Sequence, residues 1–354
     1  MRKTAVVFSP IFTKHNPGMD HPESARRVTA VIREIEKRKV DFDARLQFVQ
    51  PEKASREDVE LVHAREYVRL VEAVCRAGGG PLDSEDTVVS RDSFEVALYA
   101  VGGALRAVNL VMERKFENAF ALVRPPGHHA ERFRALGFCI FNNVAIAAQI
   151  LIKKYELNKV LILDIDAHHG NGTQKEFYGT QKVLYMSLHE DPTDFPRTGF
   201  MDEVGRGEGA GYTVNIPLPY GTGDHVYLRA VREIVTPIAH QYEPEFILLS
   251  AGFDSHYLDP IGNLSLSAKC FEQILETVTC LASRLCDRKL VGVLEGGYNV
   301  KNLGQLAVMA IAKMSMTEMK MAERPPIIKR NAISQGEKII EETKKTQSSF
   351  WKMY

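Results

Sequence analysis

The sequence has few cysteines, and none of them is paired at a metal-binding or redox spacing. Its 354 residues contain five cysteines, an odd number, with no Cys-x-x-Cys motif. This excludes a disulfide framework and is typical of a reducing compartment, so we expect a cytoplasmic protein.

An excess of charge and long apolar runs are also missing. Lys+Arg and Asp+Glu are balanced at 45 each, and no strongly basic stretch stands out, so we expect no direct nucleic-acid binding. We expect no segment to be long enough to span a membrane. The apolar part of the N-terminus, residues 4–8, is too short for a signal peptide. A hydrophobic content of 45% is ordinary for a globular protein.

What the sequence does contain is a regular alternation of short apolar runs and amphipathic helical patterns. The strands that we expect are residues 4–8, 120–123, 160–163, 183–189, 212–216, 246–250 and 290–294. The alternation predicts an α/β fold with a mostly parallel sheet and helices on both faces. We expect one catalytic domain over residues 1–330.

A charged helical segment with an aromatic end, residues 331–354, follows this domain. Phe350, Trp351 and Tyr354 would form an association-prone hydrophobic patch if they were exposed together. We therefore expect them to pack on the domain or in a subunit contact, which leaves a homo-oligomer possible.

Polar residues gather just after four of the expected strands, at 128–129, 164–168, 254 and 298. In open parallel sheets, ligands bind outside the carboxyl ends of the strands. The clustering at one edge predicts an active site there.

The central cluster runs from Asp164 to Thr173. In an extended chain, side chains two residues apart share a face, so Asp164, Asp166 and His168 would point the same way. Gly170 and Gly172 allow a tight turn just beyond. This pattern indicates an incomplete metal site; polar caps at a helix N-terminus are the alternative.

Asp166, His168 and Asp254 together supply three nitrogen or oxygen ligands. Three protein ligands and an open position are typical of catalytic zinc. Two carboxylates largely cancel the charge of the metal, so its water needs a separate general base. His128 and His129, on a Pro-Pro-Gly loop, are the candidates for this base.

Tyr298 follows the last strand on a Gly-Gly turn. A phenol can donate a hydrogen bond to a developing oxyanion, although a tyrosine packed in the core is the alternative. Metal, base and oxyanion donor together indicate hydrolysis of a carbonyl bond.

Eight stretches of the chain resemble motifs of the histone deacetylase superfamily, which includes acetylpolyamine amidohydrolases and acetoin utilisation proteins. In the order of that family they are His21–Glu23, Arg124–Ala130, Gly137–Asn143, Asp164–Thr173, Ser187–His189, Ala251–Asp254, Asp259-Pro260 and Glu295–Tyr298. The motifs ending in Asp254 and Tyr298 resemble those of the class II branch and its bacterial relatives.

The resemblance implies an arginase-like fold and a zinc-dependent deacylase. Its substrate would be an acetylated or otherwise acylated lysine in a protein or peptide, or an acetylated polyamine, with release of acetate. Zinc would bind Asp166, His168 and Asp254, the histidines 128 and 129 would be the acid/base pair, and Tyr298 would polarise the carbonyl.

The resemblance also implies roles around this centre. Asp164 would orient His128 and bind a structural potassium ion, together with the Ser187 hydroxyl and the backbones of Asp166, His168 and Leu188. Asn171 takes the place of the acidic partner of the second histidine, which leaves His129 without a carboxylate neighbour. Arg27 would lie near the acetate exit. The substrate-binding positions would be Gly137, Phe138, Phe195 and Gly297.

Two other functions stay open. A two-manganese ureohydrolase shares the fold, but this chain has Gly170 and His256 where a second metal needs acids. The other alternative is an inactive module that binds acylated lysine or polyamine. We expect the acidic stretch Asp83, Glu85 and Asp86 to be a solvated loop; at a substrate rim it would attract cations.

Overall fold

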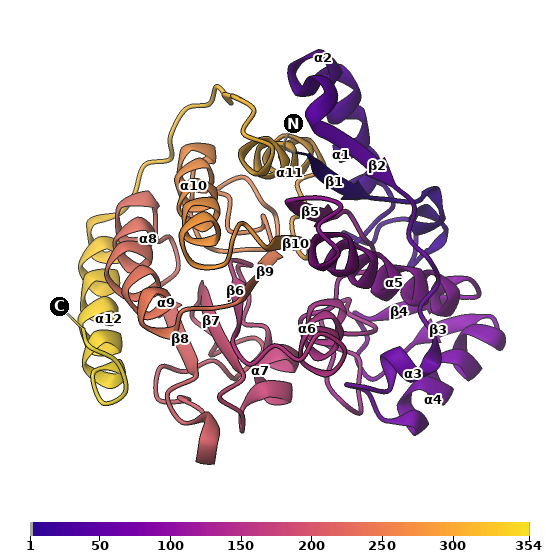
Figure 1. Ribbon diagram of the computed structural model, residues 1–354, viewed down its shortest axis with the longest axis horizontal. Coiled ribbons are helices and arrows are strands. Elements are labelled where there is room, and N and C mark those ends of the chain that lie inside the picture. Colours follow the sequence, from indigo (N-terminus) through magenta and orange to yellow (C-terminus); the bar gives the residue numbers. More distant parts are fainter. Residues whose placement is uncertain (1–2, 354) are drawn as a thin grey trace.

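One open β-sheet forms the centre of the protein in the computed structural model, which describes residues 3–353 (Figure 1). Within these residues the sheet has eight strands in the order β2-β1-β5-β10-β9-β6-β7-β8, and all neighbouring pairs are parallel. The strands are Thr4–Val7 (β1), Leu46–Val49 (β2), Asn118–Ala121 (β5), Val160–Asp164 (β6), Val183–Glu190 (β7), Thr213–Leu218 (β8), Phe246–Ala251 (β9) and Leu290–Leu294 (β10). A separate antiparallel hairpin pairs Gly79–Pro81 (β3) with Val88–Ser90 (β4).

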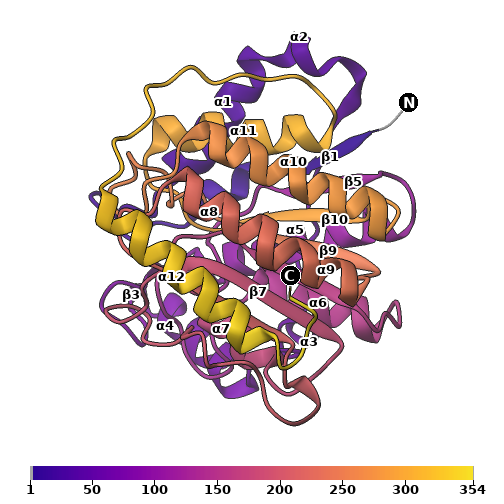
Figure 2. The same cartoon turned by 90° about the vertical axis from the view of Figure 1, so that its left-hand side faces the viewer.

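Helices cover both faces of the sheet. On one face, α5 packs on β1, β5 and β10, α6 on β6 and β9, and α7 on β7. On the other face, α8 to α12 pack with one another and with α1, and Figure 2 shows α8 to α12 side by side. The helices are Arg26–Lys37 (α1), Lys39–Phe42 (α2), Arg56–Val59 (α3), Arg65–Arg76 (α4), Ser93–Met112 (α5), Asn143–Lys153 (α6), Asn171–Phe177 (α7), Asp224–Ala230 (α8), Thr236–Tyr242 (α9), Ala268–Leu285 (α10), Val300–Met314 (α11) and Arg330–Gln347 (α12).

The apolar strands are buried along their whole length because both faces of the sheet are covered. Every residue of β6 and β9 is buried, which is the burial expected of a parallel strand between two helical layers. Helix starts follow from capping: the Ser267 side chain accepts from the Cys270 backbone in front of α10, and Asn142 caps α6 in the same way. The predicted single-domain α/β fold with a mostly parallel sheet is confirmed.

The expectation that no segment could span a membrane is wrong for α5 by length and composition. This 20-residue helix has a mean hydropathy of 1.4, but 67% of its most apolar stretch is buried inside the protein. Its apolar surface packs against three strands and against α6, as in the core helix of a globular domain.

Helix α12 begins at Arg330 and packs along the edge strand β8 (Figure 1). Beyond the helix, the Trp351 indole donates to the Gly211 carbonyl at 2.8 Å and meets the Tyr212 ring edge-on. Phe350 is 42% exposed, and Tyr354 lies outside the described residues. The chain end therefore docks on the domain through Trp351, while a domain division at residue 330 and a homo-oligomer stay predictions.

Candidate active site

Adjacent strands bring the predicted site residues to one edge of the sheet. His128 and His129 follow β5, Tyr298 follows β10 and Asp254 follows β9, and these three strands are neighbours in the sheet. Asp166 and His168 follow β6, the next strand along. The clustering expected from strand ends is thus what the fold produces.

Asp166, His168 and Asp254 form a compact set of potential metal ligands. One donor atom from each lies within 4.8 Å of the others. Nδ1 of His168 is 3.2 Å from Asp254 Oδ2 and 3.4 Å from Asp166 Oδ1. The remaining carboxylate oxygens are held by backbone donors, Asp254 Oδ1 by Ala167 and Asp166 Oδ2 by Gly296.

Glycines lie directly against the two carboxylates and leave no room for a side chain there. A Cβ at Gly296 would lie 2.4 Å from Asp254 Oδ2, and one at Gly252 would lie 2.1 Å from Asp166 Oδ2. Burial and the nearby Asp166 charge raise the pKa of Asp254 to about 7. Two buried acids this close favour a cation between them, so the donor set fits a divalent metal.

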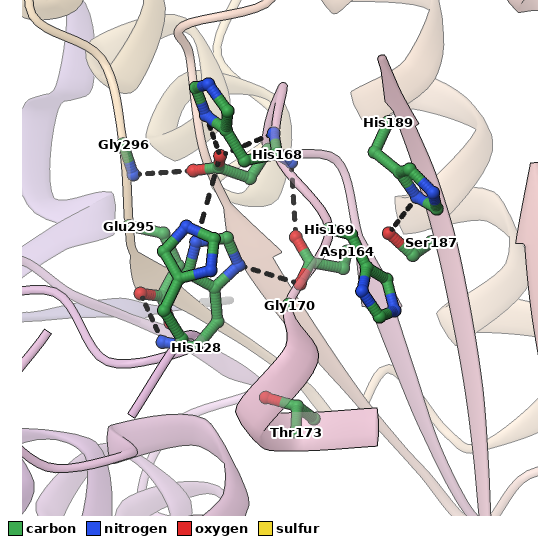
Figure 3. A network of polar contacts seen from close by, with 12 residues as sticks. His128, Asp164, His168, His169, Gly170, Thr173, Ser187, His189, Glu295 and Gly296 are labelled. Atoms are coloured by element: carbon green, nitrogen blue, oxygen red, sulfur yellow. Dashed lines mark hydrogen bonds and ion pairs between the residues drawn. The ribbon is translucent and has the colours of Figure 1, made fainter. Parts of the chain in front are cut away.

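The prediction that Asp164, Asp166 and His168 share one face assumed an extended chain, but the strand ends at Asp164. The chain bends at residues 166–168, and the Asp166 amide donates to Asp164 Oδ1 at 3.2 Å. Asp164 Oδ2 accepts from His128 Nδ1 at 3.0 Å (Figure 3). It also accepts from the Tyr185 hydroxyl at 3.1 Å. Asp164 therefore contacts His128 and lies outside the ligand set.

The paired histidines have opposite electrostatic surroundings. Burial alone would lower the pKa of His128, but the carboxylates of Asp166 and Asp164 outweigh it and raise the pKa to about 10. Burial and the adjacent His128 hold the pKa of His129 well below its usual range. With ring centroids 4.0 Å apart, the pair combines a cationic and a neutral imidazole at neutral pH.

Asn171 is the side-chain partner of His129, as predicted, and no carboxylate contacts the His129 ring directly among the described hydrogen bonds. Nδ1 of His129 lies 2.8 Å from Asn171 Oδ1. The Asn171 amide group donates in turn to the carboxylate of Glu131 at 2.7 Å, and Lys175 also donates to this carboxylate. The Glu131 carboxylate therefore reaches His129 only indirectly, through the Asn171 side chain.

Glu295 holds the backbone of the loop that carries His128 and His129, a contact that sequence reasoning missed. Its Oε2 accepts from the backbone amide of His128 at 3.1 Å (Figure 3), and from that of Gly127 at 2.7 Å. Burial raises the pKa of Glu295 to about 7. The motif around Tyr298 thus contributes an acid that fixes the position of the histidines.

Tyr298 and Arg27 pack against each other. The Arg27 guanidinium lies 4.8 Å from the centre of the Tyr298 ring, and its Nε donates to the Gly297 carbonyl at 2.7 Å. Burial raises the pKa of Tyr298 well above its usual value, so the phenol stays protonated at neutral pH. Asp259 accepts from the Tyr298 backbone amide at 2.6 Å and anchors the turn.

A cavity of about 400 Å³ opens onto these groups. Its lining residues are Asp86, His129, Gly137, Phe138, His168, Glu190, Asp194, Phe195, Tyr220, Ile261, Asn263 and Tyr298. Phe138 packs edge-on against Tyr298, and Phe195 packs edge-on against His129. Gly297, predicted to bind substrate, is not part of this lining; it lies where its carbonyl accepts from Arg27.

The acids of the loop after β3, Asp83, Glu85 and Asp86, are exposed as expected, but one of them also reaches the cavity. Asp86 lines the cavity, and its carbonyl is 3.0 Å from the His21 ring. Asp83 accepts from the Ala135 amide. Sequence reasoning also missed Glu190, although this residue ends β7 and so follows the same rule as the other polar clusters.

Gly137 is the lining residue where a side chain would be most disruptive. Its φ is +53°, and a Cβ would lie 2.5 Å from His129 Cδ2 and 3.0 Å from Phe195 Cζ. We expect Gly137→Ala to lower stability by roughly 1–3 kcal/mol through backbone strain and activity on the order of 10²-fold through displacement of His129.

Gly207→Ala is the matched control for this substitution. Gly207 has a φ of +57° and nothing within 4 Å of a built Cβ, so this variant should carry the strain and retain activity. Thermal unfolding and steady-state kinetics on both variants separate the effects. Equal activity in the two would contradict the crowding argument.

These observations define an α/β protein with hydrolytic machinery at the carboxyl edge of its sheet. The chain belongs to the histone deacetylase family, because the histone deacetylase domain matches residues 21–314.

Proteins similar to this chain include a probable deacetylase of Archaeoglobus fulgidus, which is 40% identical over 99% of both chains. Histone deacetylase 10, chloroplastic, of Oryza sativa is 37% identical over 80% of this chain and 67% of its own. Histone deacetylase 9 of Homo sapiens is 35% identical over 84% of this chain but only 32% of its own length. The crystal structure of the HDA15 HD domain superposes with a TM-score of 0.88 at 32% identity, covering 99% of this chain and 95% of the other.

The surroundings of His256 argue against the ureohydrolase alternative. Its Nε2 lies 3.0 Å from Glu323, and its Nδ1 lies 3.2 Å from the Asn302 amide. Both ring nitrogens are thus engaged away from the ligand set. Gly170 offers no ligand, and a Cβ there would lie 2.5 Å from Asp164.

Proposed function

We propose that this protein is a zinc-dependent deacylase that hydrolyses the amide of an acylated lysine or polyamine and releases acetate from acetylated substrates. The observation that carries the proposal is the meeting of three groups at one cavity. The ligand set of Asp166, His168 and Asp254, the histidine pair and the phenol of Tyr298 lie at neighbouring strand ends. Membership of the histone deacetylase family supports it.

Each residue has a role that follows from its surroundings. A bound zinc ion would supply a Lewis acid that activates water and polarises the carbonyl. His129, neutral and with its Nδ1 on Asn171, takes a proton from the attacking water. His128, positively charged beside Asp164, stabilises negative charge and can protonate the leaving amine. The Tyr298 hydroxyl donates a hydrogen bond to the oxyanion.

The cavity walls suit a narrow, extended acyl-amine. Phe138 and Phe195 provide apolar surface for the linker, and Gly137 has no side chain that would crowd His129 and Phe195. We also propose a potassium ion near Asp164 and Ser187, which are paired in the register of β6 and β7. The five free cysteines support the proposed cytoplasmic location.

Tyr298→Phe tests the oxyanion role, because it removes one oxygen and keeps the ring on Arg27. We expect turnover of an unactivated acetyl-lysine amide to fall roughly 10²–10³-fold, with fold and zinc content retained. Tyr257→Phe is the control, since its hydroxyl bonds only the Arg324 carbonyl among the contacts described, and it should retain activity.

Turnover near that of the wild type in Tyr298→Phe would remove this residue from the mechanism. The same assay, run with acyl-lysine peptides against acetylated polyamines, distinguishes the two substrate classes. No hydrolysis of either class by the zinc-loaded wild type would favour the inactive binding module.

A further inference from the structure

Glu190 is a buried acid whose position the proposed mechanism does not use. It ends β7 and is only 5% exposed, although it lines the cavity. Among the described residues, its one ion-pairing partner within 4 Å is His168, with Oε1 3.7 Å from Nε2. Burying a carboxylate is costly unless it is paired, so this placement calls for an explanation.

The geometry of His168 shows which ring nitrogen faces Glu190. Nδ1 is turned to the carboxylates of Asp166 and Asp254, at 3.4 and 3.2 Å. A metal in this set would bind the Nδ1 lone pair, so the ring proton would be on Nε2. That N–H points to the side where Glu190 lies, and a carboxylate is the strongest acceptor for it.

Glu190 is itself held in place from two directions. Its carboxylate accepts from the backbone amide and the side-chain amide of Asn263, at 2.5 and 2.9 Å. Its own backbone amide donates to the Ala167 carbonyl at 2.7 Å, next to His168 in the chain. The acid is therefore fixed beside the ring and cannot swing freely into solvent.

We propose that Glu190 is a positioning residue for the metal centre, which accepts the Nε2–H of His168 and so fixes the ring with Nδ1 toward the metal. Outer carboxylates of this kind orient ligating histidines and raise their basicity. Asp194 provides a contrast: it lines the same cavity, but it is exposed and accepts from the Tyr220 hydroxyl.

The test is zinc affinity, measured on the full chain by competition with a chromophoric chelator. We expect Glu190→Gln to bind zinc about 10–100-fold more weakly than the wild type. Asp194→Asn, which removes the same charge from the same cavity, should keep the zinc affinity of the wild type. Circular dichroism and thermal unfolding of the metal-free proteins report whether each variant folds.

Asn263→Ala keeps Glu190 but removes its side-chain donor, and it carries the test if Glu190→Gln does not fold. We expect a smaller loss of zinc affinity in the same direction. Wild-type zinc affinity in Glu190→Gln would overturn the proposal. A higher KM for a cationic substrate with unchanged zinc affinity would overturn it too, since Glu190 would then act on the substrate and not on the metal centre. The inference rests on the zinc centre proposed above; failure of that centre would instead show as a wild-type protein that binds no zinc.

Discussion

Replacing Asp254 with alanine is expected to leave a folded protein that binds no zinc and hydrolyses no acyl-lysine amide. The reason is that two remaining ligands, Asp166 and His168, cannot hold the ion in an open site. Elemental analysis of the dialysed protein should show one zinc per chain in the wild type and none in the variant. A deacylase assay should show the same loss.

Asp194→Ala is the control, because it removes an exposed acid of the same cavity outside the ligand set. It should keep its zinc. Two metals per chain in the wild type, or a metal-replete Asp254→Ala, would contradict the assignment of this centre. If Asp254→Ala loses both its zinc and its fold, Asp254→Asn replaces it in the test, because an asparagine retains an acceptor for the Ala167 amide.

His129→Ala should retain zinc and lose roughly 10²–10⁴-fold in rate, the usual contribution of a general base. The low pKa of His129, caused by burial and by the charge of His128, keeps it neutral and able to accept a proton. His128→Ala is expected to be impaired through loss of a positive charge. Zinc content and steady-state kinetics of both variants provide the measurement.

His225→Ala is the control for these histidines, since its side chain is 70% exposed. A much greater loss in His128→Ala than in His129→Ala would reverse our assignment of the two roles. Full activity in His129→Ala would exclude it as the base.

The predicted fold and much of the candidate site followed from two properties of the chain. Short apolar runs bounded by polar loop residues, such as Val160–Leu163, favour buried strands, and parallel strands bring their carboxyl ends to one edge. That reasoning brought Asp166, His168, Asp254 and Tyr298 together without any knowledge of contacts. The assumption of an extended chain did not hold beyond Asp164, because residues 166–168 form a bend.

The residues that sequence reasoning missed depend on packing between distant segments. Asn263 comes from the loop after β9 and meets Glu190 at the end of β7, and no spacing along the chain indicates that contact. The acids of the loop after β3 have the composition of an ordinary solvated turn, yet Asp86 reaches the cavity. The apolar character of α5 could not by itself distinguish a core helix from a membrane span.

The contact between His129 and Asn171 has a further chemical consequence. An amide has two ends of similar shape but opposite hydrogen-bonding sense, so its orientation decides what its neighbour must be. The Asn171 NH₂ faces the Glu131 carboxylate and the His129 carbonyl, both of which only accept. Its oxygen must therefore face His129, whose Nδ1 then carries the ring hydrogen. The imidazole is left in the single tautomer whose Nε2 lone pair is free, so a neutral amide can select the form of the ring that serves as a base.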